Sequence, residues 1–216
     1  MTEALTLYGY HHSVYTWAAR MTLHTTGVGW RDVEVNPFAA APEDQKLPHP
    51  FGRVPVLDHD SFRIYETRAI TDYIDAQFGQ DRLTPHDLRA RARMNQVIGI
   101  IDSYAHIPLV RQVFSHSVFR PWANEPSDPD AIKAGLDAAT TALSALEDIA
   151  AEGLVLTGET LSLADCHLAP MMAYFSAAPA GDDALRTKPA LTQWWDRTRR
   201  ATALAETWPV GPVQKP

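Results

Sequence analysis

The stretch His49–Ile70 reads HPFGRVPVLDHDSFRIYETRAI and carries three structural signals within about twenty residues. An apolar run begins directly after Val54-Pro55, which suits a β-strand. A short polar turn leads to a second extended run, Phe62–Tyr65, and the pair has the pattern of a hairpin. Glu66-Thr67 then begins a segment with helical spacing. The stretch therefore predicts two antiparallel strands followed by a helix.

Two features of this stretch indicate a peptide-like ligand. Proline is the residue that lowers the cost of a cis peptide bond, so Val54-Pro55 is predicted to be cis. Backbone groups next to such a bend are free to pair with an extended peptide. A helix start that carries Glu66 and Thr67 offers N–H groups to a carboxylate and an acid to an ammonium. A plain hairpin with a capped helix explains the same residues equally well.

Composition excludes several classes of function. A formal charge of −7 over 216 residues argues against a nucleic-acid partner, which selects a basic surface. No apolar run is long enough to span a bilayer, and the first residues do not resemble a secretion signal. The single cysteine, Cys166, excludes a disulfide framework. These observations predict a cytoplasmic protein without a membrane partner.

The order of the predicted elements defines the fold class. Strand patterns at 4–9 and 30–35 flank a helical pattern at 15–26 that ends at Gly27, and the hairpin and the helix at 66–78, closed by Gly79, follow. This β-α-β, β-β-α order is that of a small thioredoxin-like α/β domain, predicted over residues 1–82. A linker at 83–88 leads to an all-helical domain at 89–216.

The second half shows only helical spacing. Apolar stripes indicate one long helix around Pro108, which should bend it, and another around Leu143. Ser162 and Asp165 form a capping box ahead of an apolar run, and a last helix carries Trp194.

In four stretches the chain resembles the soluble glutathione S-transferases, most closely the phi-like and other serine-type classes. These stretches are LYGYHHS, NPF…HPFGRVPVL, ETRAITDYI and TGETLSLADCHLAP, at 7–13, 36–57, 66–74 and 157–170. The resemblance covers nearly the whole chain. It implies a glutathione-binding N-terminal domain, a helical domain that supplies a second-substrate pocket, and a homodimer.

The resemblance also implies roles for single residues. Ser13 falls on the catalytic hydroxyl that stabilises the glutathione thiolate. Val54, beside Pro55, falls where the backbone pairs with the cysteinyl unit. Glu66 and Thr67 fall where the γ-glutamyl group is held. Tyrosine-type members use a tyrosine near the first strand instead, so Tyr10, Tyr15 and Tyr8 remain alternatives, as does a chain with no catalytic hydroxyl.

One end of glutathione has no clear partner in the sequence. The family's basic loop residues, which bind the glycine carboxylate, are replaced by Ala40 and Ala41. Lys46 and Arg53 are the nearest substitutes, and His12 is a further candidate for binding glutathione. No histidine has metal-ligand spacing, so no metal is predicted.

The second-substrate pocket and the dimer contact are predicted from aromatic and basic residues of less specific position. Phe51 falls where some classes insert an aromatic side chain into the partner subunit. The basic run at Arg89, Arg91 and Arg93 indicates a solvated face or a dimer contact. The pocket candidates are Tyr10, Tyr104, Arg111, Phe114 and Trp122, with Phe119 and Trp208 beside them.

The leading hypothesis for function is conjugation of glutathione to small apolar electrophiles. The same fold also serves glutathione-dependent isomerases and dehalogenases. The missing basic loop residues leave a third alternative, a binding module without catalysis. The sequence after Ser13, Val14-Tyr15, lacks the further serine and cysteine that are typical of the isomerase class.

Overall fold

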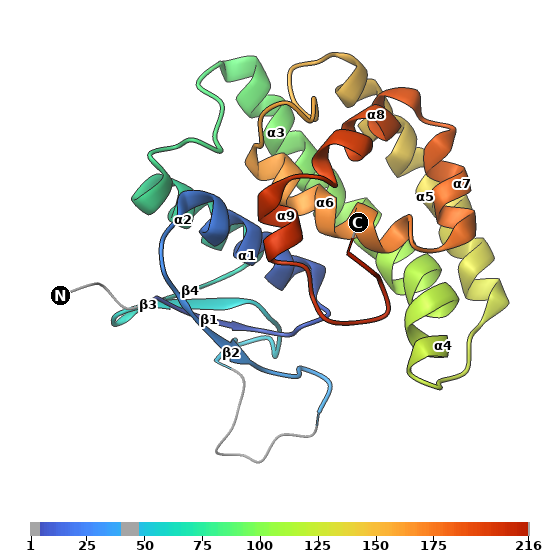
Figure 1. Cartoon of the computed structure of the whole chain (residues 1–216), viewed down its shortest axis with the longest axis horizontal. Helices are drawn as coiled ribbons and strands as arrows, with labels where there is room; N and C mark the ends of the chain where they lie inside the picture. The colour runs from blue at the N-terminus through green and yellow to red at the C-terminus, as the bar shows by residue number, and fades with distance from the viewer. Residues whose placement is uncertain (1–4, 40–47, 216) are drawn as a thin grey trace.

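The computed structural model describes residues 5–39 and 48–215. It contains a small sheet, two helices that lie on it, and a larger helical domain (Figure 1). In the first domain the elements are β1 Leu5–Gly9, α1 Val14–Thr26, β2 Arg31–Glu34, β3 Val56–His59, β4 Phe62–Tyr65, α2 Thr67–Ile74 and the π-helical turn η2 Asp75–Gly79. This is the predicted thioredoxin-like order of elements.

The sheet has the order β2-β1-β3-β4. β1 is parallel to β2 and antiparallel to β3, and β3 is antiparallel to β4. Leu7 and Leu57 on the two central strands are fully buried, and they pack with Ala19 of α1 and Ile70 of α2. Both helices therefore cover one face of the sheet.

The second domain is entirely helical, as predicted. A continuous helix runs from residue 88 to 122 through α3 Leu88–Ile100, η3 Ile101–Ala105, η4 Ile107–Phe119 and α4 Arg120–Trp122. Much of it is π-helical and includes Pro108, whose missing N–H removes one helical hydrogen bond. The remaining helices are α5 Pro129–Ala151, α6 Leu163–Phe175, α7 Pro179–Arg186, α8 Pro189–Thr198 and α9 Thr202–Glu206.

The helical domain holds the larger core, and α6 is at its centre. All thirteen residues of α6 are buried, including Cys166 and His167. Trp17 of α1 lies in this same core and contacts Tyr174 of α6, with ring centroids 5.6 Å apart. The two domains therefore share one continuous interface along α1 and α6.

Some details differ from the sequence-based expectations. α7 and α9 were not predicted, because each is short and follows a proline or a polar turn. Gly79 was expected to close the helix after α2, but the left-handed residue there is Gln80, with φ 54°. Gly79 instead leaves room for its neighbours, since a Cβ atom there would lie 2.5 Å from a carboxylate oxygen of Asp75.

Among the described residues no helix is long and apolar enough to cross a membrane.

Candidate active site

The predicted ligand site lies where three strands end side by side. β3 is the central neighbour: Val56 pairs with Tyr8 of β1 on one side and with Tyr65 of β4 on the other. The residues just before β3 therefore lie between the turn after β1 and the start of α2. This register brings Val54-Pro55 next to both of the other predicted glutathione-binding segments.

The bend before β3 has the predicted form. The Val54-Pro55 peptide bond is cis, and Pro55 is buried at the head of the strand. Within the part of the chain that the structure describes, no backbone hydrogen bond is made by Val54. Its N–H and C=O groups are thus available to an extended peptide.

The start of α2 is formed by Glu66 and Thr67. Glu66 is the residue before the helix and has a positive φ of 71°, which L residues rarely adopt. Its side chain is 65% exposed, and a carboxylate oxygen lies 3.7 Å from Nε2 of His49. Thr67 is buried as the first helical residue. An acid, a hydroxyl and helix N–H groups are therefore presented at one point.

His49 supports this arrangement and was not singled out from the sequence. It is buried, and its Nδ1 accepts a hydrogen bond from the Phe51 backbone at 3.1 Å. Burial lowers the pKa of His49, the nearby Glu66 raises it and Arg53 lowers it further. His49 thus connects the loop before Val54 to the start of α2.

Ser13 caps helix α1. Its Oγ accepts a hydrogen bond from the Thr16 backbone at 3.2 Å, and its own N–H donates to the Tyr10 carbonyl at 3.0 Å. Because the oxygen accepts from the helix, the hydroxyl hydrogen is available to a ligand. Ser13 is therefore the N-cap of α1, and this geometry leaves the catalytic role open.

Tyr15 has a different partner from that expected of a catalytic tyrosine. Its ring packs against His106 of the helical domain, with ring centroids 4.9 Å apart, and the charge of Asp102 in η3 acts on its hydroxyl. Burial raises the pKa of Tyr15 far above its ordinary value, and the charges of Asp102 and Glu66 add to this effect. Burial also raises the pKa of Asp102. Tyr15 therefore stays protonated and connects the two domains.

Five rings form an interdomain aromatic cluster beside Ser13. Centroid distances between contacting pairs run from 5.1 to 5.8 Å, and the contacts are edge-on or tilted. The members are Tyr10, His12, Phe38, Phe119 and Trp122. Nδ1 of His12 is buried without a hydrogen-bond partner among the described residues, and burial lowers the pKa of this histidine. His12, proposed from the sequence to bind glutathione, thus lies among the second-substrate candidates.

The other pocket candidates are divided by the structure. Arg111 lies over the ring of Phe38, with Cζ 5.4 Å from the centroid. Phe114 is buried and stacks on Tyr174 at 4.1 Å, so it belongs to the core behind the cluster. Tyr104 is 70% exposed and has no ring contact with the described residues. Trp208 packs on Trp17 at 4.9 Å.

The C-terminal tail passes over His12. A Cβ atom at Gly211 would lie 3.1 Å from Cε1 of His12, so only glycine leaves the ring in place. The tail is fixed by Trp208, whose indole N–H donates to the Val213 carbonyl at 2.9 Å. Trp208 of this tail was among the pocket candidates predicted from the sequence, whereas Phe38, which lies in a loop, was not.

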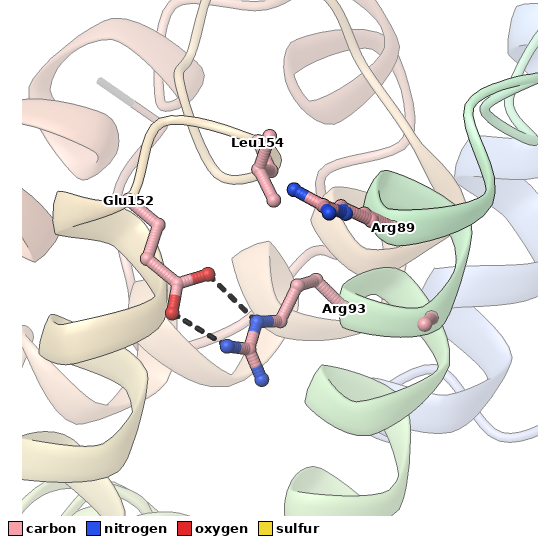
Figure 2. Close-up of a pocket in the computed structure, with 5 residues that line it drawn as sticks. Arg89, Arg93, Glu152 and Leu154 are labelled. Atoms are coloured by element: carbon pink, nitrogen blue, oxygen red, sulfur yellow. Dashed lines mark hydrogen bonds and ion pairs between the residues drawn. The ribbon is translucent and has the colours of Figure 1, made fainter.

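A separate surface depression lies on the helical domain, between the first turns of α3 and the end of α5 (Figure 2). Arg93 there pairs with both carboxylate oxygens of Glu152, at 2.6 and 2.7 Å. Arg89 points toward Leu154 and has no ion pair with any described residue. Of the predicted basic run, Arg93 is therefore engaged within the chain, and Arg91 donates to the Pro85 carbonyl.

The fold defines a class: a thioredoxin-like domain joined to an all-helical domain, with aromatic side chains of both gathered in one cluster. Comparison with known proteins identifies the family. Residues 7–82 match the glutathione S-transferase N-terminal domain model, and residues 129–197 match the C-terminal domain model.

Individual relatives agree with these matches. The chain is 28% identical to glutathione S-transferase F13 of Arabidopsis thaliana, over 89% of this chain and 90% of that one. It is 30% identical to glutathione S-transferase 1 of Dianthus caryophyllus, over 79% and 77% of the two chains. The crystal structure of glutathione transferase F7 from Populus trichocarpa superposes with a TM-score of 0.79 at 25% identity, covering 95% of this chain and 99% of that one. The chain belongs to the glutathione S-transferase family, and it is a glutathione-using transferase of phi-like type.

Proposed function

We propose that this protein joins the thiol of glutathione to small apolar electrophiles, with Ser13 stabilising the thiolate. Residues 1–82 would bind glutathione, 83–88 would link the domains, and 89–216 would supply most of the second-substrate site. The observation that carries the proposal is the register of β3, which brings Val54-Pro55 between the Ser13 turn and Glu66-Thr67.

Glutathione fits this site in an extended form. Its cysteinyl unit would pair with the free backbone groups of Val54 in the manner of an added strand. Its γ-glutamyl carboxylate would accept from Thr67 and the α2 N–H groups, and its ammonium would meet Glu66. Arg53 is exposed beside the site and would pair with the glycine carboxylate. Lys46, the other candidate for that role, and Ala40 and Ala41, which replace the family's basic residues, lie outside the described residues.

The stabilisation that Ser13 can provide is large enough to lower the thiol pKa as the proposed chemistry requires. A free thiol titrates near 8.5, and lowering its pKa by about two units requires roughly 2.7 kcal/mol of selective thiolate stabilisation. A hydrogen bond to a charged group contributes about 1.5–3 kcal/mol. The positive end of α1 adds to this, because Ser13 is the residue that caps that helix. The thiolate would then attack an electrophile bound against the interdomain aromatic cluster.

Substitution of Ser13 tests this mechanism. Ser13→Ala should raise the pKa of bound glutathione toward 8.5 and lower kcat/KM about 10- to 100-fold, measured from thiolate absorbance and conjugation rates across pH. Ser13→Asp provides a matched control for the helix cap, because it keeps an acceptor for the Thr16 N–H but cannot donate to sulfur. Ser13→Thr should retain most activity. Wild-type thiol pKa and rate in Ser13→Asp would refute the role.

The two alternatives give different products. A glutathione-dependent isomerase returns the thiol after each turnover, so glutathione would not be consumed with its substrate. A module without catalysis would bind glutathione with no thiolate signal near neutral pH. Stoichiometric loss of glutathione with an apolar electrophile supports the transferase and excludes both alternatives for that electrophile.

We also propose a homodimer and a cytoplasmic location. Phe51 is 71% exposed beside Tyr65, with ring centroids 6.4 Å apart, and such an exposed aromatic pair favours a partner surface. Sedimentation of wild type and Phe51→Ser checks the dimer. The single cysteine, which is buried, favours a reducing compartment.

A further inference from the structure

Arg111 is a cation at the edge of the interdomain aromatic cluster. It extends from η4 of the helical domain and lies over Phe38, which belongs to the loop after β2 in the other domain. Its guanidinium is exposed, and it makes no ion pair or hydrogen bond with a residue in the described ranges 5–39 and 48–215. Phe38 thus positions the Arg111 side chain, and the guanidinium charge remains available to bind a ligand.

The acids near the cluster already have partners. Glu34 accepts from the His11 backbone N–H at 2.9 Å, and Glu125 lies 3.6 Å from Arg120. Among the described residues Arg111 therefore has no carboxylate partner, although the chain as a whole carries a formal charge of −7. Within the described residues, Arg111 is therefore an unneutralised cation in a chain that is acidic overall.

Arg53 reinforces the positive charge from the opposite domain. His106 of the helical domain is close to both arginines. Burial, together with the charges of Arg111 and Arg53, lowers its pKa to about 4. His106 is consequently neutral at physiological pH, and it does not offset either cation or add a third charge.

An arginine stacked on a ring keeps the edge of its guanidinium free. That edge presents parallel N–H donors that match a carboxylate in bidentate fashion. A neutral electrophile would gain nothing from these donors. We propose that the preferred second substrate is an aromatic or apolar electrophile bearing a carboxylate, with its apolar body on Phe38 and the cluster and its carboxylate on Arg111. This inference rests on the proposed conjugation.

A suitable reaction is thiol addition to an enone. The glutathione sulfur forms a bond to the terminal alkene carbon, the π pair moves to the carbonyl oxygen as an enolate, and a solvent proton completes the adduct. Nothing leaves and no oxidant is needed. Ethacrynic acid, an aryl enone with a remote oxyacetate, and its oxyacetamide have matched reactive ends and differ in charge alone.

The experiment measures kcat/KM for both electrophiles at saturating glutathione. We expect wild type to favour the acid over the amide by about five- to tenfold, Arg111→Gln to lose that preference while keeping its rate with the amide, and Arg111→Lys to keep part of it. Added salt should reduce the preference in wild type only. Arg89→Gln is the matched control, because it removes an unpaired exposed arginine at the distant depression of Figure 2, and it should retain the full preference.

Failure of the inference can be distinguished from failure of the proposed function. Equal rates for acid and amide in wild type would overturn the inference and leave conjugation intact. Loss of preference in Arg53→Gln but not in Arg111→Gln would overturn the assignment to Arg111. If wild type conjugates neither compound, the proposed function fails. The inference is then decided by calorimetric binding of the saturated, unreactive acid to glutathione-loaded protein, where Arg111→Gln should weaken binding about five- to tenfold and unchanged binding refutes it.

Discussion

Asp165 is a buried carboxylate that joins two helices of the core. It accepts hydrogen bonds from the Ser162 N–H at 2.7 Å, from the Ser162 hydroxyl at 2.6 Å and from the Trp194 indole N–H at 2.7 Å. Its side chain has no exposed surface. The capping box read from the sequence is therefore also a tertiary contact between α6 and α8.

At this residue scale, Ser162→Ala should cost more than an ordinary cap. Loss of an N-cap alone costs about 1 kcal/mol. Here the substitution also removes a donor from a buried carboxylate, which raises the expected loss to about 2–3 kcal/mol of unfolding free energy. Urea unfolding checks the value, with Ser162→Thr as the variant that keeps the hydroxyl. A loss of 1 kcal/mol or less would show that the buried bond adds nothing to the cap.

At the scale of elements, the turn η2 holds the chain segment that leaves the first domain through hydrogen bonds. Asp75 is fully buried and accepts from the Leu83 N–H at 3.1 Å and from the Thr84 hydroxyl at 2.8 Å. The Leu83 carbonyl in turn accepts from the Leu163 N–H of α6 at 2.9 Å. The π-helical turn and the segment after it are therefore connected directly to the central helix of the second domain.

Gly79→Ala tests how tightly this element is packed. Besides the Asp75 oxygen, an added Cβ would lie 2.9 Å from Cγ2 of Thr26, and neither atom can move without breaking a contact. We expect a loss of about 1–3 kcal/mol by urea unfolding, the usual range for overpacking. Gly99→Ala is the control, since a Cβ there meets nothing within 4 Å and alanine favours helix by up to about 1 kcal/mol. Equal effects of the two substitutions would refute the argument.

At the scale of the whole molecule, His167 joins the domains from within the core. It is 1% exposed on α6, and Nε2 lies 3.0 Å from the hydroxyl of Thr71 on α2. Burial, together with the charge of Arg68, lowers the pKa of His167 to about 3. The folded protein therefore keeps this histidine neutral at a pH where the unfolded chain protonates it.

The sign of the pH dependence follows from this difference. Above about pH 6.5, the ordinary histidine value, both states are neutral and His167 causes no loss. As the pH falls from about 6.5 toward 3, His167 becomes protonated in the unfolded state but stays neutral in the folded state. This difference should lower the free energy of unfolding by up to about 1.4 kcal/mol per pH unit. Urea unfolding between pH 7.5 and 4.5 should show a shallower fall in His167→Gln than in wild type. Parallel curves would contradict the prediction.

The order of strands and helices followed from local patterns. Alternation, helical spacing and the turn residues of His49–Ile70 were enough to predict the thioredoxin-like domain, the cis bond at Pro55 and the helix that starts after Glu66. These features depend on residues close together in the chain, and their physical causes, such as the low cis cost of proline, act locally. The short helices α7 and α9 were missed because they depend on tertiary packing, α7 on α5 and α8, and α9 on α1 and α6, rather than on their own pattern.

The second-substrate side of the site was decided by tertiary structure. Phe38, His12 and Arg111 are far apart in the sequence, and Phe114 and Tyr104 carry the same kind of signal as Trp122, yet one is core and the other lies on the surface. An aromatic or basic side chain in a helix has the same pattern whether it faces a neighbour, a ligand or water. The sequence by itself determined the strand ends and the helix start on which the proposed glutathione site depends, because these are local features. Only the packing of the two domains determined which side chains meet in the interdomain aromatic cluster, which we propose to face the electrophile.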